Sequence, residues 1–222
     1  MSIHDGWLLL QGAAPHPPHH YAVTTANVLV LFFIMLGPIK MIGPFFAATK
    51  DLERSVVRGI AWKVFIVGVI ALLLAGLGGR ALMSNWGISV PVMLLAAGLV
   101  FLIVALKLVL EQYEAPHPPE PVGKPQSLAM RMTFPVTVTP YGVAALIVFM
   151  TMSGELSRSL AVFSMAFVVM VLNLLAMLGA RQIMRWIGVM PLQILGAVLG
   201  ILQVALALQF MVQGVRDLGW AP

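Results

Sequence analysis

The chain has 222 residues, of which 60% are hydrophobic and 9% are charged, and its mean hydropathy is +0.99. This composition excludes an ordinary soluble globular domain and indicates a multi-pass membrane protein. Lys and Arg (13) exceed Asp and Glu (8). Because the basic residues fall mostly in short loops between apolar runs, they indicate membrane orientation and no nucleic-acid partner. The absence of cysteine excludes a disulfide, a thiol relay and a thiolate metal site.

Residues 1–23 form a lead-in before the first long apolar run. Met1–Asp5 carry no basic stretch, so no cleaved signal peptide is expected. The apolar segment Trp7–Leu10 is too short to cross a bilayer. A cluster of histidines could hold a metal, but its Pro-rich surroundings favour a solvated tail: His16, His19 and His20. We therefore predict no metal and no cofactor.

Six long apolar runs follow, each about the length that a helix needs to cross ~30 Å of hydrocarbon. They cover approximately residues 24–48, 57–79, 87–110, 132–152, 158–180 and 187–212. The sequence therefore predicts an all-α, polytopic membrane fold with six transmembrane helices.

The six helices fall into two groups that resemble each other. A Pro-rich linker, 113–130, separates residues 24–112 from residues 131–214, and a tail, 215–222, follows. At an offset of 100 residues several uncommon residues coincide, namely Arg58 with Arg158, Trp86 with Trp186 and Pro91 with Pro191. Such coincidences indicate an internal repeat. Since each repeat crosses the membrane an odd number of times, the repeats are expected to be inverted, as in many secondary transporters.

The basic loop residues predict the orientation of these helices. The larger group falls on one side of the membrane: Lys50, Arg54, Arg58, Lys124, Arg131, Arg181 and Arg185. The smaller group falls on the other side: Arg80, Arg158 and Arg216. The positive-inside rule makes the first side cytoplasmic. The linker is then cytoplasmic and both termini are periplasmic.

The first and fourth apolar runs contain helix-breaking residues at matched positions. The stretch Leu36–Phe46 holds two prolines, two glycines and a lysine, and its counterpart is Thr137–Gly142. Proline removes a backbone donor and clashes with the carbonyl one turn back. Such a break survives in lipid only where protein or a water-filled cavity supplies the missing hydrogen bonds. Two broken helices are therefore predicted near the midplane, as is typical of a substrate pathway.

Each predicted break offers two kinds of ligand group. Half-helices that begin there, with Thr139 as a cap, favour an anion. Half-helices that end near Leu36 and Val138 leave carbonyls for a cation. A small zwitterion such as an amino acid fits both subsites. The candidate substrate-binding residues are Gly37, Pro38, Lys40, Thr137, Thr139, Pro140, Gly142 and Asn173.

Lys40 and Asn173 are the polar side chains of most interest among these candidates. Lys40 could contact a substrate carboxylate, lose its proton during transport, or extend along its stem to a cavity. Asn173 lies in the fifth run, where its repeat counterpart is the apolar Leu73. Helix-to-helix hydrogen bonding is the alternative role for such a residue.

The middle of every apolar run lacks Asp, Glu and His. This disfavours a carboxylate proton relay and a hard-metal site, and it leaves no catalytic arrangement, so no enzyme is expected. Two alternatives to a transporter stay open. The breaks could be packing features of a structural or regulatory envelope protein, or the protein could be a passive channel.

With these residues in place, the chain resembles the MarC family of bacterial inner-membrane proteins, within the superfamily of LysE-type exporters. The resemblance is carried by the Phe and Pro arrangement of Phe33–Phe46, by Thr49 and Arg58, by Gly87–Ser89, by Pro135 with Pro140–Gly142, and by Gln209–Gly214. It implies an inner-membrane protein that moves small neutral amino acids or similar metabolites. Its partners would be a small-molecule substrate and the lipid bilayer, with a coupling ion and a homo-oligomer left open.

The chain departs from the usual family pattern at both breaks. The family usually has Asn-Pro-x-Gly at the first break, where this chain has Gly37-Pro38-Ile39-Lys40, and Gly-Pro-Gly at the second, where this chain has Thr139–Gly142. The added Lys40 would shift preference toward a more anionic substrate or replace a bound cation.

Overall fold

The computed structural model describes residues 25–110, 125–153 and 155–219, and every regular element in these ranges is a helix. In chain order the helices are α2 (Thr25–Leu36), α3 (Ile39–Thr49), α4 (Arg54–Asn85), α5 (Val90–Leu110), α6 (Pro125–Arg131), the π-helix η1 (Met132–Thr137), α7 (Pro140–Met152), α8 (Leu156–Ile187) and α9 (Val189–Asp217). The all-α prediction is confirmed. The predicted lead-in, its histidines and residues 113–124 of the linker lie outside the described residues.

The helices give the described chain five candidate membrane spans without a sharp bend and one bent span. The five are Val28–Thr49, Arg54–Asn85, Val90–Lys107, Leu156–Ile187 and Met190–Asp217. The first of them includes the short break between α2 and α3. The sixth joins Ser127–Thr137 to Pro140–Met152 with a bend of 57°. This agrees with the prediction of a six-helix polytopic protein.

Two helices are longer than their apolar runs suggested. α4 and α8 each have 32 residues, which corresponds to a length of about 48 Å. Hydrocarbon accounts for only ~30 Å of that. Both helices therefore continue past the apolar runs 57–79 and 158–180, because polar residues at a membrane surface can also be helical.

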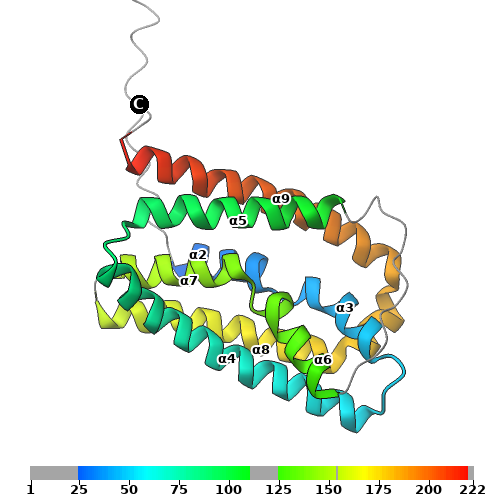
Figure 1. The fold of residues 1–222 in the computed structure, drawn as a ribbon. Helices are drawn as coiled ribbons and strands as arrows, with labels where there is room; N and C mark the ends of the chain where they lie inside the picture. The colour runs from blue at the N-terminus through cyan, green and yellow to red at the C-terminus, as the bar shows by residue number, and fades with distance from the viewer. Residues whose placement is uncertain (1–24, 111–124, 154, 220–222) are drawn as a thin grey trace, which may run out of the picture.

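The interrupted helices lie between two pairs of long helices. Figure 1 shows α5 and α9 side by side along one edge, α4 and α8 along the opposite edge, and α2, α3 and α7 between them, while α6 contacts α4. Buried apolar side chains such as Phe32, Leu146 and Met170 fill the space around α2 and α7. This arrangement encloses both helix breaks within protein.

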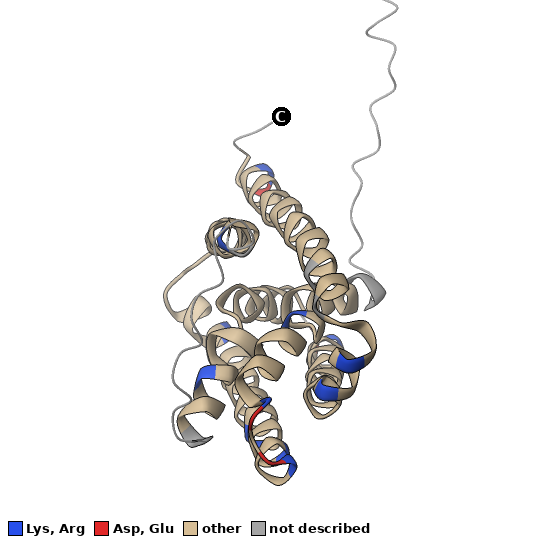
Figure 2. Cartoon of the chain, turned by 90° about the vertical axis from the view of Figure 1, so that its right-hand side faces the viewer, with Lys and Arg blue, Asp and Glu red and all other residues tan. Residues whose placement is uncertain are grey.

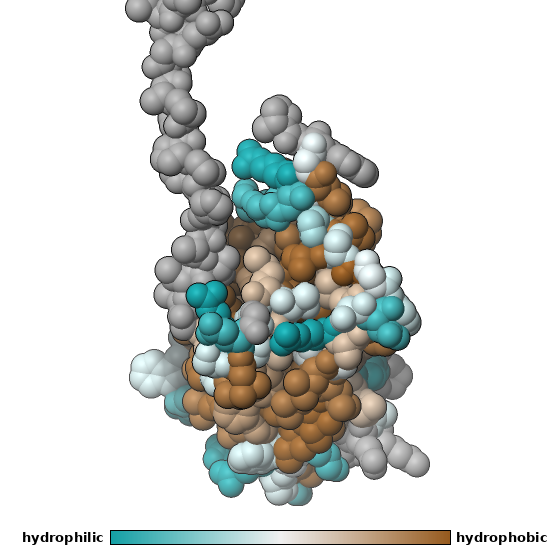
Figure 3. Space-filling view, turned by 90° about the vertical axis from the view of Figure 1, so that its left-hand side faces the viewer, coloured by the Kyte–Doolittle hydropathy of each residue, from teal (hydrophilic) through white to brown (hydrophobic). Residues whose placement is uncertain are grey.

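The outer surface is apolar, as a bilayer requires. Large side chains such as Leu74 (69% exposed), Leu77 (64%) and Ile201 (63%) face outward. Figure 3 faces the end at which α4 and α9 finish, and hydrophobic residues cover much of this face between scattered hydrophilic ones.

Basic residues gather at the other end of the helices. Lys50, Arg54 and Arg58 lie where α3 ends and α4 begins, and Arg181 and Arg185 lie near the end of α8. Figure 2 faces this end and shows Lys and Arg on several of the elements that meet there.

Both halves have the same order of elements, an interrupted helix followed by a 32-residue helix and a further helix. The inverted relation of the halves, the division at residues 113–130 and the periplasmic placement of the termini stay predictions.

Candidate functional site at the two helix breaks

The first break separates α2 from α3 at Gly37 and Pro38. Pro38 has no N–H, so the carbonyl of Ile34 loses the donor that a continuous helix would supply. Gly37 is required because a Cβ atom there would lie 1.6 Å from the carbonyl oxygen of Phe33. These two residues therefore dictate the break locally.

The second break separates η1 from α7 at Val138 and Thr139. The side-chain oxygen of Thr139 accepts a hydrogen bond from the Gly142 N–H at 3.2 Å, and Pro140 occupies the first turn of α7. This is the cap predicted from the sequence, since proline at this position lacks only a donor that would be unpaired anyway. Thr137 Oγ1 donates to the Met132 carbonyl at 2.7 Å, so part of the interrupted backbone is satisfied locally.

The two breaks meet. Thr139 Oγ1 lies 3.4 Å from the carbonyl oxygen of Met35, at the end of α2. Thr137 Oγ1 lies 3.3 Å from the sulfur of Met41, in α3. Gly142 permits this close approach, because an added Cβ would lie 2.5 Å from Leu36 Cδ2. Residues about 100 positions apart thus form one junction.

Lys40 connects the two sides of this junction. Its Nζ reaches back across the break to donate to the Met35 carbonyl, and it donates to the Tyr141 hydroxyl at 3.0 Å. The same Nζ lies 5.2 Å from the centre of the Tyr141 ring, and that ring stacks on Phe101 with centres 4.4 Å apart. The Lys40 amino group therefore lies at the C-terminal end of α2, where the helix dipole favours its protonated form.

Side chains from the long helices satisfy the neighbouring carbonyls. Asn173 Nδ2 in α8 donates to the Leu36 carbonyl at 2.6 Å, and Gln203 Nε2 in α9 donates to the Ile34 carbonyl at 2.9 Å. At the end of α2, one of the two places where carbonyls were predicted to accept from a cation, the carbonyls thus accept from Lys40, Thr139, Asn173 and Gln203 of the same chain. Asn173 Oδ1 is buried and has no partner among the described residues.

A cavity of about 200 Å³ lies beside the junction, and we call it the central cavity. Its lining residues are Lys40, Pro44, Val104, Lys107, Pro135, Val136, Thr139 and Tyr141. Of the predicted site residues, Lys40 and Thr139 line it. The other predicted residues lie at or against the helix breaks and do not line the cavity: Gly37, Pro38, Thr137, Pro140, Gly142 and Asn173. Sequence reasoning missed Tyr141, although a single aromatic residue directly after Pro140 was a signal for it.

The lining of the central cavity is cationic. The described lining residues include the amino groups of Lys40 and Lys107 and the hydroxyl groups of Thr139 and Tyr141, and none of these residues carries a carboxylate. Lys107 lies in the last turn of α5, so the cavity extends from the junction toward the basic end of the helices. Within the described ranges, no group of three His, Asp or Glu residues could hold a metal ion.

The described chain has six candidate spans when the bent pair is counted as one. Two of these spans are interrupted, and they meet beside the central cavity. These features define a multi-pass integral membrane protein. The chain belongs to the MarC family: the description "MarC family integral membrane protein" matches residues 22–218. This confirms the resemblance noted from the sequence.

Curated relatives share this length and class. The chain is 23% identical over 188 residues to a UPF0056 membrane protein of Methanocaldococcus jannaschii, covering 83% of this chain and 92% of the relative. It is 21% identical over 207 residues to the UPF0056 inner membrane protein MarC of Salmonella typhimurium, covering 86% and 93%. It is 22% identical over 212 residues to a UPF0056 membrane protein of Buchnera aphidicola, covering 90% and 97%. No solved structure matches the chain.

Proposed function

We propose that this MarC family protein is a secondary transporter, and no enzyme, that carries a small neutral amino acid or a similar small metabolite across the bacterial inner membrane. The substrate is held in the central cavity, and both termini are periplasmic. The observation that carries the proposal is the position of the Lys40 ammonium group, at the meeting point of two interrupted membrane helices and in the wall of a cavity.

The chemistry of the lining supports a substrate with a carboxylate. An ammonium group inside a membrane protein needs a partner, and a charge-assisted hydrogen bond to a carboxylate is stronger than one to a neutral oxygen. The hydroxyl oxygens of Thr139 and Tyr141 lie on the same cavity and can accept from a substrate ammonium group. Because pockets for drug-sized ligands have volumes of about 300–1,000 Å³, a cavity of about 200 Å³ favours a smaller molecule.

The junction also supports alternating access. The bond from Lys40 to Tyr141 joins a residue of the first half to a residue of the second half, 101 positions apart. A substrate carboxylate that binds Lys40 competes with this bond and so loosens the contact between the interrupted helices. Breaks that exchange internal for substrate contacts are the usual site of motion in transporters with discontinuous helices.

Two observations support the proposed location in the inner membrane, namely the apolar outer surface and the names of the relatives. The Salmonella protein to which the chain is similar is named an inner membrane protein. The basic end of the helices, on which Lys50, Arg54 and Arg185 lie, faces the cytoplasm in this proposal.

The proposal is tested by transport of labelled glycine, alanine and serine into proteoliposomes that contain the purified full-length chain. We expect saturable flux, and we expect Lys40→Met to lower it about tenfold or more, because the charge-assisted contact is lost. Lys63→Met is the control, since Lys63 lies exposed on α4.

Each outcome of this experiment has a defined meaning. Absence of flux for every amino acid would refute the substrate class. Equal flux through Lys40→Met and Lys63→Met would remove Lys40 from the site. Flux that rises linearly with concentration would indicate a passive channel.

A further inference from the structure

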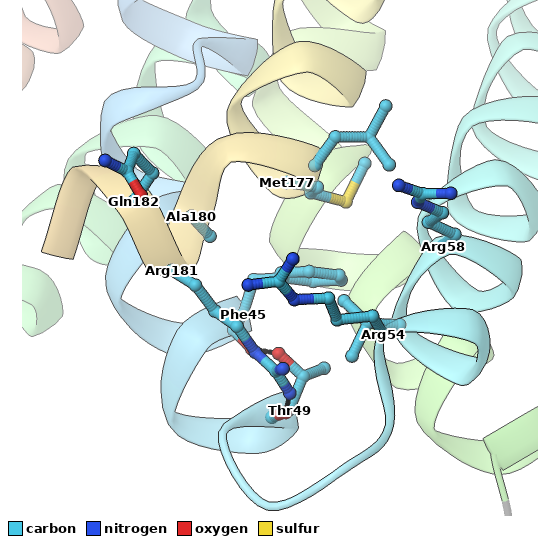
Figure 4. Close-up of a pocket in the computed structure, with 10 residues that line it drawn as sticks. Phe45, Thr49, Arg54, Arg58, Met177, Ala180, Arg181 and Gln182 are labelled. Carbon is cyan, nitrogen blue, oxygen red and sulfur yellow. Dashed lines mark hydrogen bonds between the residues drawn. The ribbon is translucent and has the colours of Figure 1, made fainter. Parts of the chain in front are cut away.

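A second cavity, separate from the central cavity, lies at the basic end of the helices. It has a volume of about 200 Å³ and lies between the end of α3, the beginning of α4 and the last part of α8. We call it the arginine pocket. Its lining residues are Phe45, Thr49, Arg54, Val57, Arg58, Met177, Leu178, Ala180, Arg181 and Gln182. Figure 4 shows its position.

Arg54 and Arg58 are exposed basic side chains of the arginine pocket. They lie four positions apart on α4, so they share one face of the helix. Figure 4 shows the Arg54 side chain extending over Phe45 and the Arg58 side chain extending toward Met177. Within the described ranges, neither guanidinium forms an ion pair with a carboxylate. Asp51 and Glu53 in the preceding loop do not line the pocket.

Arg181 forms a fixed wall of the same pocket. Its Nη2 donates to the carbonyls of Thr49 (2.7 Å), Lys50 (3.3 Å) and Leu52, where α3 ends. Its Nε is buried and has no partner among the described residues. Arg181 is therefore held against the backbone at the end of α3 through Nη2.

We propose that the arginine pocket binds a phosphate group. Three guanidinium groups line a small cavity, and none of its described lining residues carries a carboxylate. Guanidinium binds phosphate oxygens through paired hydrogen bonds. The pocket also adjoins the N-terminus of α4, whose dipole favours an anion. The phosphate is that of an anionic phospholipid headgroup or of a soluble molecule. Basic pockets between membrane helices commonly bind such headgroups. This inference does not depend on the proposed transport function.

The test uses the purified full-length chain and the double variant Arg54→Gln/Arg58→Gln. Both side chains are exposed, and neither donates a hydrogen bond to a backbone carbonyl among the described residues. Their replacement therefore leaves the fold intact. Arg181 is left unchanged because it supports α3. Arg185→Gln is the matched control, since Arg185 is exposed one turn further along α8 and does not line the pocket.

Lipid binding is measured by native mass spectrometry with phosphatidylglycerol, and phosphatidylethanolamine is the zwitterionic comparison. We expect the wild type and Arg185→Gln to retain phosphatidylglycerol, and the double variant to retain about tenfold less, as the loss of charge-assisted bonds predicts. A parallel thermal-shift titration compares inorganic phosphate with sodium chloride at equal ionic strength.

The two measurements distinguish the sources of the phosphate. Selective loss of phosphatidylglycerol in the double variant identifies a lipid headgroup. Stabilisation by inorganic phosphate that the double variant alone loses identifies a soluble ligand. If the double variant and Arg185→Gln behave alike in both measurements, the proposal is wrong.

Discussion

The side-chain amide of Gln203 donates to the carbonyl oxygen of Ile34 at 2.9 Å, across 169 positions of the chain. Ile34 lies four residues before Pro38, so its carbonyl is the one that proline leaves without a helical donor. Gln203 is only 2% exposed. A polar residue in α9 thus repairs the backbone of a break in α2–α3, as a helix interrupted inside a membrane protein requires.

Replacing this amide should weaken the fold. Gln203→Leu leaves the Ile34 carbonyl without a donor in a dry environment, so we expect a loss of about 1–2 kcal/mol in the free energy of unfolding. Thermal unfolding of the purified protein in detergent measures the change. Gln213→Leu is the control, because Gln213 bonds only to Asp217 at the surface of the same helix. An equal effect of both substitutions would show that the Ile34 bond contributes nothing specific.

Gly37→Ala should prevent normal folding. The new Cβ would lie 1.6 Å from the Phe33 carbonyl oxygen, a backbone atom that cannot move aside without changing the break. We expect destabilisation above about 4 kcal/mol, in the range reserved for severe local disruption. Gly78→Ala is the comparison, since a Cβ there meets nothing within 4 Å and alanine favours a helix by about 1 kcal/mol over glycine. Yield of folded protein by size-exclusion chromatography separates the two. A well-folded Gly37→Ala protein would contradict the geometry of the first break.

The side-chain amide of Asn173 should stabilise the fold as a hydrogen-bond donor. Asn173→Leu removes the 2.6 Å bond to the Leu36 carbonyl, and we expect a loss of about 1–3 kcal/mol, since a buried acceptor stays unpaired. Asn173→Asp should be worse, because it places a carboxylate oxygen opposite that carbonyl. Chemical unfolding in detergent tests this order. Ser164→Ala serves as the control, since Ser164 is exposed and bonds only within α8. Wild-type stability in both Asn173 variants would show that this donor is dispensable.

Tyr141→Phe should separate the contribution of the Tyr141 hydroxyl from that of its ring. The substitution removes the 3.0 Å bond from Lys40 but keeps the ring that stacks on Phe101. We expect a small loss of stability, about 1 kcal/mol, and a change in the apparent affinity for substrate, because Lys40 loses a partner in the central cavity. Thermal unfolding and proteoliposome flux measure the two effects. A change in stability without any change in flux would place the hydroxyl outside the substrate site.

The sequence was sufficient to predict the breaks themselves. Proline at 38 and 140 removes backbone donors, and Thr139 before Pro140 is a strong cap, so both follow from local chemistry. The position of Lys40 within an apolar run also marked it correctly as a polar group at the first break. These features depend only on neighbouring residues.

Partners that are distant in the chain could not be predicted in the same way. Gln203 and Asn173 lie in different helices from the carbonyls that they bind, and apolar periodicity does not determine which face of a long helix meets a break. The second break was expected at Pro140, but the π-helical stretch Met132–Thr137 before it was not. Within it Phe134 is extended (φ −132°, ψ 130°), as the residue before a proline commonly is, so Pro135 was a local signal that sequence reasoning did not use.

Arg181 should be the main support for the end of α3. Its Nη2 bonds to the carbonyls of Thr49, Lys50 and Leu52, and a cation at a helix C-terminus also complements the helix dipole. Arg181→Gln should lower the free energy of unfolding by about 1.5–3 kcal/mol, as expected for hydrogen bonds to a charged group. Arg181→Lys should recover only part of this, because an ammonium group lacks the planar geometry of guanidinium. Thermal unfolding ranks the variants against the exposed Arg185→Gln. Equal midpoints for Arg181→Gln and Arg185→Gln would mean that α3 ends stably without this contact.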